Sequence, residues 1–171
     1  MSRRLLPAAL AALVLAGCAT APRSPGTWVA GRMSVEVHPA DAPARRVASA
    51  FELQGDGERG ELRLTSPLGS VVAAARWAPG EAVLTTADGE TRYGGLDELS
   101  QQALGETLPL AALPDWLAGR PWSGAPHAAT ARGFEQLGWN VDLARRDEGW
   151  IEAARAAPPP MQVRVRLEAP G

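Results

Sequence analysis

The stretch from residue 60 to residue 77 reads GELRLTSPLGSVVAAARW. Leu62 and Leu64 alternate with polar residues in its first part, and a second alternating run covers 71–77. A period of two is typical of a β-strand with one buried face. The four residues between the runs, SPLG at 66–69, have the composition of a tight loop. The stretch therefore predicts two antiparallel strands joined by a short connection.

Further alternating runs lie on both sides of this pair. They span residues 28–37, 47–53, 82–86, 90–93, 134–138, 139–143, 150–153 and 161–167. Turn signals such as Gly55-Asp56-Gly57 and Asp88-Gly89 separate several of them, and short turns of this kind connect neighbouring antiparallel strands. We therefore expect an antiparallel meander.

The middle of the chain has a helical pattern. Apolar residues recur at helical spacing over 96–104 and stop at Gly105, which predicts a helix there. A second helical pattern covers 109–119, and Pro114 is expected to kink it or to divide it into two short turns. Many strands, two helical segments and further strands indicate one α+β domain whose helices pack on one face of a curved sheet.

Composition limits the chemistry that the chain can perform. The 171 residues carry a formal net charge of −2, and all 17 basic residues are Arg. Without a basic surplus, we expect no nucleic acid partner. The single Cys rules out an internal disulfide, and His38 and His127 match no metal-ligand or triad spacing. We therefore expect no metal, no cofactor and no enzymatic activity.

The N-terminus has the order of an export signal. Two arginines precede an apolar stretch over 5–15, which is too short to span a bilayer, and Leu15-Ala16-Gly17-Cys18 follows. This order resembles the bacterial lipobox, which implies cleavage before Cys18 and acylation of its thiol. The alternative is a secretory signal with a Cys placed there by chance. The sequence thus predicts a signal peptide over 1–17 and an acylated Cys18 with a short tether over 18–27.

Four motifs follow this lipobox in order. They are Leu62-x-Leu64-x-Ser66-Pro67-Leu68-Gly69, LPLAALPDWLAG at 108–119, Gln136-x-Gly138-Trp139-x-Val141 and the strand at 160–167. Together they resemble the LolB family of outer-membrane lipoprotein receptors. The resemblance implies that residues 28–171 form an incomplete antiparallel β-barrel with a helical lid enclosing an apolar cavity. It also implies an anchor in the outer membrane at Cys18, with the domain facing the periplasm.

The same resemblance implies a function in lipoprotein transport. LolB proteins accept acylated lipoproteins from the periplasmic carrier LolA and insert them into the inner leaflet of the outer membrane. The implied partners are therefore a LolA-type carrier, acylated cargo and outer-membrane lipid, and we expect the receptor to be a monomer. Hiding an acyl chain from water is worth about 0.8 kcal/mol per CH₂ group, so this function needs a dry cavity rather than reactive side chains.

Two groups of residues are candidates for this function. By resemblance, the loop Pro67-Leu68-Gly69 presents Leu68 for insertion into the membrane, although Leu68 could instead fold back onto the core. The cavity is predicted to be lined by Val35, Phe51, Leu53, Leu64, Trp77, Leu99, Leu113, Trp116, Leu117, Trp139 and Val141. The sequence does not distinguish a hollow barrel from a filled one, so these residues could also form an ordinary core.

Two other functions stay open at this point. The chain could be another acyl- or glycolipid-binding lipoprotein on the same half-barrel, or a structural lipoprotein with a filled core. One difference from the family pattern bears on the cavity. Where the family has Phe-x-Trp in the second strand, this chain has Phe51-x-Leu53, which puts a smaller side chain at that position.

Overall fold

The computed structural model describes residues 27–169. The predicted signal peptide over 1–17 and the predicted acylation site Cys18 therefore lie outside the described residues. The remainder corresponds closely to the predicted domain over 28–171.

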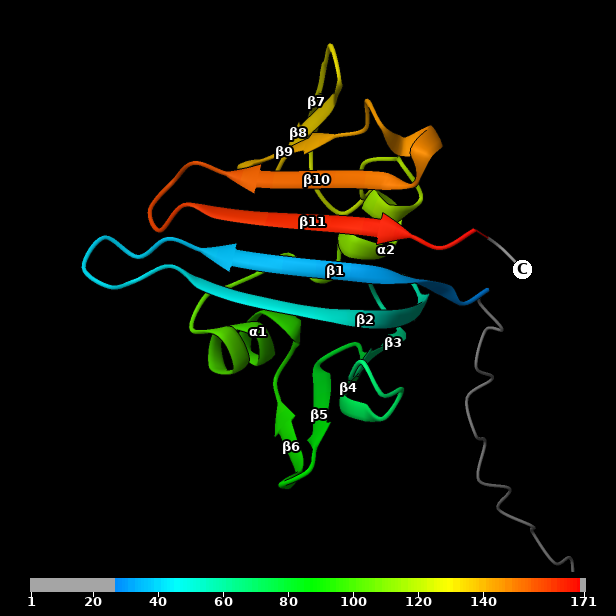
Figure 1. Cartoon of the computed structure of the whole chain (residues 1–171), viewed down its shortest axis with the longest axis vertical. Helices are drawn as coiled ribbons and strands as arrows, with labels where there is room; N and C mark the ends of the chain where they lie inside the picture. The colour runs from blue at the N-terminus through cyan, green and yellow to red at the C-terminus, as the bar shows by residue number, and fades with distance from the viewer. Residues whose placement is uncertain (1–26, 170–171) are drawn as a thin grey trace, which may run out of the picture.

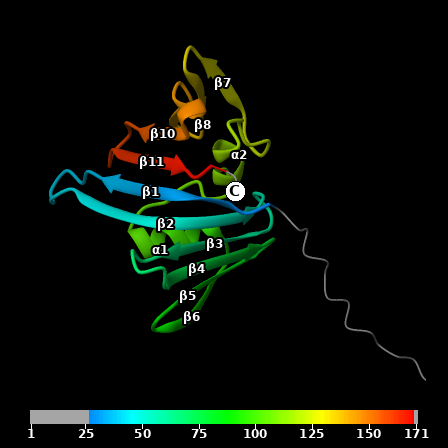
Figure 2. The same cartoon turned by 45° about the vertical axis from the view of Figure 1, so that its right-hand side comes forward.

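The described chain forms one antiparallel sheet of eleven strands, in the order β6-β5-β4-β3-β2-β1-β11-β10-β9-β8-β7 (Figure 1). The strands are β1 (Val29–Val37), β2 (Arg45–Gly55), β3 (Gly60–Thr65), β4 (Val71–Ala78), β5 (Glu81–Thr86), β6 (Gly89–Tyr93), β7 (His127–Thr130), β8 (Gly133–Gln136), β9 (Trp139–Asp142), β10 (Trp150–Arg155) and β11 (Met161–Leu167). The expected meander is confirmed, and the sheet is open and curved (Figure 2).

The centre of the sheet joins the two ends of the described chain. β1 pairs with β2 on one side and with β11 on the other, so that Val35 lies opposite both Val47 and Val163. The last strand is therefore an inner strand. The two edges belong to β6 and β7, which lie at opposite ends of the molecule (Figure 1).

Few helices accompany the sheet. α1 (Leu96–Leu104) ends at Gly105 with φ 76°, as its sequence predicts, because Gly accepts a left-handed backbone readily. The second expected helix is much shorter than its pattern, since only α2 (Leu113–Leu117) is helical. Pro114 lies at the beginning of α2, where no helical hydrogen bond is lost, rather than at a kink. In Figure 1, α2 lies behind the central strands β11 and β1, whereas α1 lies below β2 in the view and contacts β5 and β6.

One strand and one turn were not predicted. β7 is only four residues long, and its sequence HAAT alternates weakly, which explains why no strand was expected there. The runs at 134–138 and 139–143 are the hairpin of β8 and β9, with Leu137 and Gly138 as a two-residue turn at φ 55° and 77°. Such turns are usually signalled by Asn-Gly, and Leu at positive φ gives no such signal.

Alternation along the strands places the core on the inner face of the sheet. Phe51 and Leu53 of β2, Val141 of β9 and Val165 of β11 are each at most 2% exposed. The register brings these side chains to the same face, where they share one core with residues of both helices, such as Leu99 and Trp116. The smaller Leu53 is thus fully buried.

Candidate functional site

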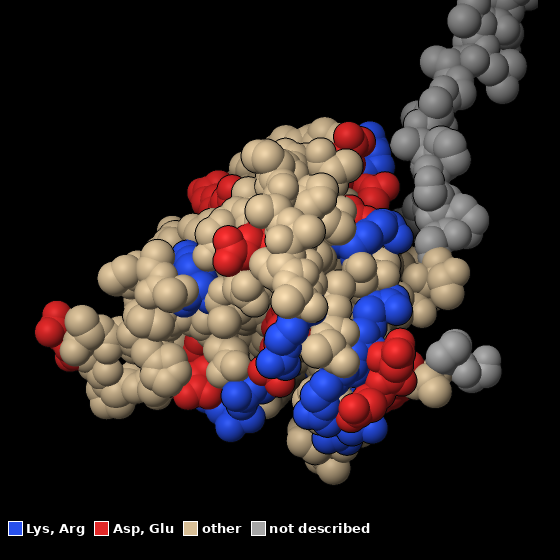
Figure 3. Space-filling model, turned by 90° about the horizontal axis from the view of Figure 1, so that it is seen from above, with Lys and Arg blue, Asp and Glu red and all other residues tan. Residues whose placement is uncertain are grey.

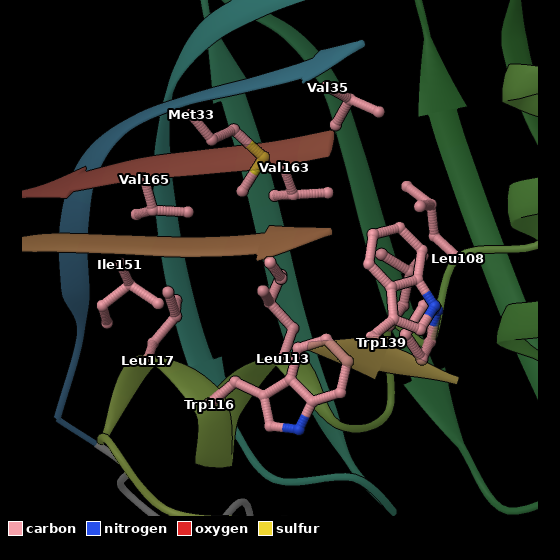
Figure 4. Close-up of a pocket in the computed structure, with 13 residues that line it drawn as sticks. Met33, Val35, Leu108, Leu113, Trp116, Leu117, Trp139, Ile151, Val163 and Val165 are labelled. Carbon is pink, nitrogen blue, oxygen red and sulfur yellow. The ribbon is translucent and has the colours of Figure 1, made fainter. Parts of the chain in front are cut away.

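An apolar pocket lies between the inner face of the sheet and the segment that contains α2 (Figure 4). It encloses about 40 Å³ of free space. Only apolar side chains line it: Met33, Val35, Leu108, Pro109, Leu110, Leu113, Trp116, Leu117, Trp139, Ile151, Ala153, Val163 and Val165.

Strand alternation and helix spacing bring these side chains together. The wall on the sheet side comes from every second residue of β1, β10 and β11, which the antiparallel register places in adjacent rows. On the other side, Leu113, Trp116 and Leu117 are spaced so that they share one face of α2. Trp116 and Trp139 meet with ring centroids 6.3 Å apart, and they close one side of the pocket.

A buried amide fixes α2 against the sheet. Gln136 of β8 is only 2% exposed, and its Oε1 accepts hydrogen bonds from Trp116 Nε1 and from the Trp122 backbone N–H, both at 2.9 Å. Its Nε2 donates to the carbonyl oxygens of Trp122 and Ala125 at 2.7 and 2.8 Å. All four hydrogen-bonding positions of the amide are therefore used inside the protein.

The pocket contains part of the predicted lining. Val35, Leu113, Trp116, Leu117 and Trp139 line it. The other predicted residues lie elsewhere in the packed interior, and all but the half-buried Leu64 are buried: Phe51, Leu53, Leu64, Trp77, Leu99 and Val141.

Several residues of the pocket were not predicted. Met33, Val163 and Val165 belong to alternating runs that the sequence shows plainly, so their inward direction could have been read from the pattern. Ile151 and Ala153 come from a run with weaker alternation. Leu108, Pro109 and Leu110 carry no strand or helix signal, and only the path of the chain between α1 and α2 brings them to the pocket.

The loop between β3 and β4 presents Leu68 to solvent. Its side chain is 94% exposed, which excludes the alternative that it folds back onto the core. The Gly69 N–H donates to the Ser66 carbonyl at 2.9 Å, and the Ser66 N–H donates to the Ser70 carbonyl at 2.8 Å. These bonds, with Gly69 at φ 82°, hold the loop closed beneath Leu68.

Charged side chains lie mainly at the surface, where acidic and basic groups are intermingled (Figure 3). Within residues 27–169, no cluster of three or more His, Cys, Asp or Glu has metal-site geometry. The hydrogen bond between Arg145 and Glu148 raises the pKa of Arg145 and lowers that of Glu148, but this exposed pair follows β9 and does not line the pocket. In the same part of the chain, neither helix is long and apolar enough to cross a membrane.

Comparison with known proteins places the chain in a family. The family described as outer membrane lipoprotein LolB matches residues 28–169. The chain belongs to the LolB family. This confirms the resemblance carried by the four sequence motifs, and it identifies the chain as a member of a lipoprotein-receptor family rather than an enzyme family.

Relatives of this LolB-family chain cover most of its length. The outer-membrane lipoprotein LolB of Bordetella petrii is 38% identical in an alignment 160 residues long, which covers 85% of this chain and 80% of the relative. That of Bordetella pertussis is 38% identical over 78% of this chain and 74% of the relative. That of Cupriavidus pinatubonensis is 34% identical over 99% of this chain and 89% of the relative. The expected outer-membrane lipoprotein character agrees with these names.

Proposed function

We propose that this LolB-family chain accepts acylated lipoproteins from a LolA-type periplasmic carrier and releases them into the inner leaflet of the outer membrane. The pocket between α2 and the sheet is the observation that supports this function most directly. A surface lined only by apolar groups favours acyl chains because it removes their CH₂ groups from water at about 0.8 kcal/mol each.

The pocket must widen to hold an acyl chain. An apolar cavity of roughly 150 Å³ is known to bind a molecule as small as benzene, and the free space here is only about 40 Å³. Filling therefore requires the segment around α2 to move away from the sheet, as a lid would. The short α2 and the turns beside it make this segment easier to displace than the hydrogen-bonded strands opposite.

The exposed Leu68 loop supports the release step. An apolar side chain that is 94% exposed buries almost nothing in the folded protein, but it gains free energy when it enters a lipid headgroup region. In this scheme residues 28–171 are the receptor domain, working as a monomer. Cys18 carries the lipid anchor, and the tether over 18–27 holds the domain at the periplasmic face of the membrane.

A pair of variants on one strand tests the pocket. Ala153 of β10 lines the pocket, whereas Ala154 next to it is exposed on the other face of the sheet. Ala153→Val adds two methyl groups at the free space, so it should reduce the equilibrium transfer of a labelled lipoprotein from its carrier several-fold, while overpacking lowers the melting temperature by a few degrees without unfolding the protein. Ala154→Val should leave transfer unchanged.

The same assay separates the other functions. If the protein binds lipid from solution but accepts no lipoprotein from a carrier, it is a different lipid-binding lipoprotein. If neither ligand binds and Ala153→Val only destabilises the fold, the interior is a filled core and the proposed function is wrong.

A further inference from the structure

A charged side chain lies at one end of a row of alternate residues on β10, and the other residues of this row line the apolar pocket. Ile151, Ala153 and Arg155 are alternate residues of β10, and the first two line the pocket. Arg155 is paired in register with the buried Met161 and packs over the ring of Trp139, at 5.6 Å from the guanidinium carbon to the ring centroid. The guanidinium therefore lies beside Trp139, which is one of the pocket's aromatic walls, although Arg155 does not itself line the pocket.

The contacts of Arg155 connect the sheet to the segment between α1 and α2. Its Nη2 lies 3.5 Å from Glu106 Oε2, and Glu106 precedes the pocket residue Leu108 by two positions. The two side chains are only 18% and 24% exposed, so little water screens this pair. The same Nη2 donates to the Pro159 carbonyl at 3.2 Å and contacts Met161 Sδ at 3.1 Å.

One donor of this guanidinium has no acceptor. Arg155 Nε is buried and has no hydrogen-bond partner. Among residues 27–169, no other buried side-chain nitrogen or oxygen lacks one. A buried N–H without an acceptor is unfavourable, and it is uncommon in folded proteins outside functional positions. Its neighbours Trp139 and Met161 offer no strong acceptor for it.

Ligand sites for lipids combine apolar walls with a few polar groups that fix orientation. We propose that Arg155 is such a group, and that it binds the ester carbonyl oxygens of the diacylglyceryl group on the acylated cysteine of the cargo. This inference rests on the proposed function, because the acyl chains must enter the pocket to bring these oxygens to its rim.

The ion pair with Glu106 couples this site to opening of the lid. Glu106 lies on the segment that must move for the pocket to widen, so the movement withdraws its carboxylate from Arg155. The guanidinium, held by the sheet, then presents the Nε and Nη donors to the ligand. Ester carbonyls replace the carboxylate and also satisfy the Nε donor that the closed form leaves unpaired.

The test compares two synthetic lipopeptides loaded on a LolA-type carrier. One carries an N-acylated, S-diacylglyceryl cysteine, and the other is the analogue whose two glyceryl esters are replaced by ethers, which lack the carbonyl oxygens. The measurement is the equilibrium fraction of each lipopeptide that moves from the carrier to the mature receptor. Because one carrier serves all receptor variants, its own preference cancels between them.

Arg155→Met keeps an apolar stem against Trp139 and removes the donors. It should lower the transfer equilibrium of the ester lipopeptide relative to that of the ether lipopeptide about tenfold, the size expected for a lost hydrogen bond to a charged group; loss of the ion pair with Glu106 affects both lipopeptides alike. Arg164→Met is the matched control. Arg164 of β11 also pairs with a glutamate, with its Nε 3.5 Å from Glu152 Oε2, but it lies on the outer face of the sheet. It should change neither transfer.

Two more variants separate ligand binding from structural support. Glu106→Gln should raise ester transfer because it releases Arg155 without removing its donors. Arg155→Lys retains the charge but not the Nε–H donor, so it should show an intermediate loss, and thermal melts should show that each variant is folded.

The inference is overturned if Arg155→Met lowers transfer of both lipopeptides equally or of neither, or if Glu106→Gln behaves like Arg155→Met. In those cases the proposed function stands, provided that the unsubstituted receptor accepts both lipopeptides. If the unsubstituted receptor accepts neither lipopeptide, the proposed function is overturned as well.

Discussion

Leu68 is an apolar residue that the folded protein leaves almost fully exposed to water. A Leu side chain is ordinarily buried, but here it stands at the tip of a loop closed by the hydrogen bonds of Ser66. Because the loop is held by backbone bonds and not by Leu68 itself, the side chain is free to contact something outside the protein. Stability and function can therefore be changed separately at this position.

Leu68→Glu should still accept cargo but fail to release it. The substitution removes no buried contact, so it should change the free energy of unfolding by no more than ~0.5 kcal/mol. A Glu side chain entering the membrane must instead be desolvated, which opposes insertion. The measurement is a thermal melt and carrier-to-receptor uptake on the same sample, followed by release into liposomes.

Leu137→Glu is the control for this prediction, because Leu137 is another exposed turn Leu, at 46% exposure, in the β8–β9 hairpin. It should keep both uptake and release. Normal release by Leu68→Glu would remove Leu68 from the mechanism.

At the scale of elements, the position of α2 depends on one side chain of the sheet. α2 is a helix of five residues, too short to be stable by itself, and Gln136 ties its Trp116 and the following chain at Trp122 to β8. The segment that moves in the proposed function is thus attached at one end by Gln136 and bordered near Leu108 by the Glu106–Arg155 pair.

Gln136→Leu should destabilise the protein strongly. The side chains are similar in volume, but Leu leaves Trp116 Nε1 and three backbone groups of residues 122 and 125 without partners. At roughly 1–3 kcal/mol for each unsatisfied buried group, and with water replacing some of the lost bonds, the loss should be about 3 kcal/mol or more. Urea unfolding measures it, with Glu135→Gln on the exposed side of β8 as control. An unchanged midpoint would show that Gln136 does not hold α2.

At the scale of the whole molecule, the sheet is two meanders joined at β1 and β11. β1–β6 and β7–β11 are each built from neighbouring hairpins or short connections, and the β1–β11 pairing makes them a continuous surface. The pocket is formed mainly at this junction, from β1, β10 and β11 together with the α2 segment. All residues that line the pocket therefore belong to the described domain, and we expect the proposed binding to require that domain as a unit.

Cys18→Ala should release the protein from the membrane without abolishing binding. Cys18 is the only thiol of the chain, so its loss removes the site for the lipid chains that anchor a lipoprotein. The domain that contains the pocket is unchanged, so the soluble form should still accept cargo from a carrier. Membrane fractionation and mass spectrometry of the mature N-terminus measure the first effect, and an unmodified Cys18 in the native protein would contradict the prediction.

Local patterns in the sequence predicted most of the strands and α1. Alternation from 28 to 37 and from 161 to 167, and helical spacing ending at Gly105, arise from single elements with one buried face. Where a local signal was weak, prediction failed: β7 has almost no alternation, and the Leu137–Gly138 turn lacks the residues that usually mark it. The second helix was predicted too long because the chain at Pro109 and Leu110 is not helical, and α2 begins only at Leu113.

The sequence by itself indicated the family and the meander, because each motif and each alternating run is local. The exposure of Leu68, which the sequence left open, was decided by the structure. The membership of the pocket was decided only by the tertiary structure. Phe51 and Val35 are both inward residues of neighbouring strands, yet only Val35 borders the free space. The gap depends on how α2 and residues 108–110 settle against β10 and β11, and on the Gln136 and Arg155 contacts that connect segments distant in sequence. Packing across such distances leaves no period in the sequence, which is why alternation identified the inner face but not the cavity within it.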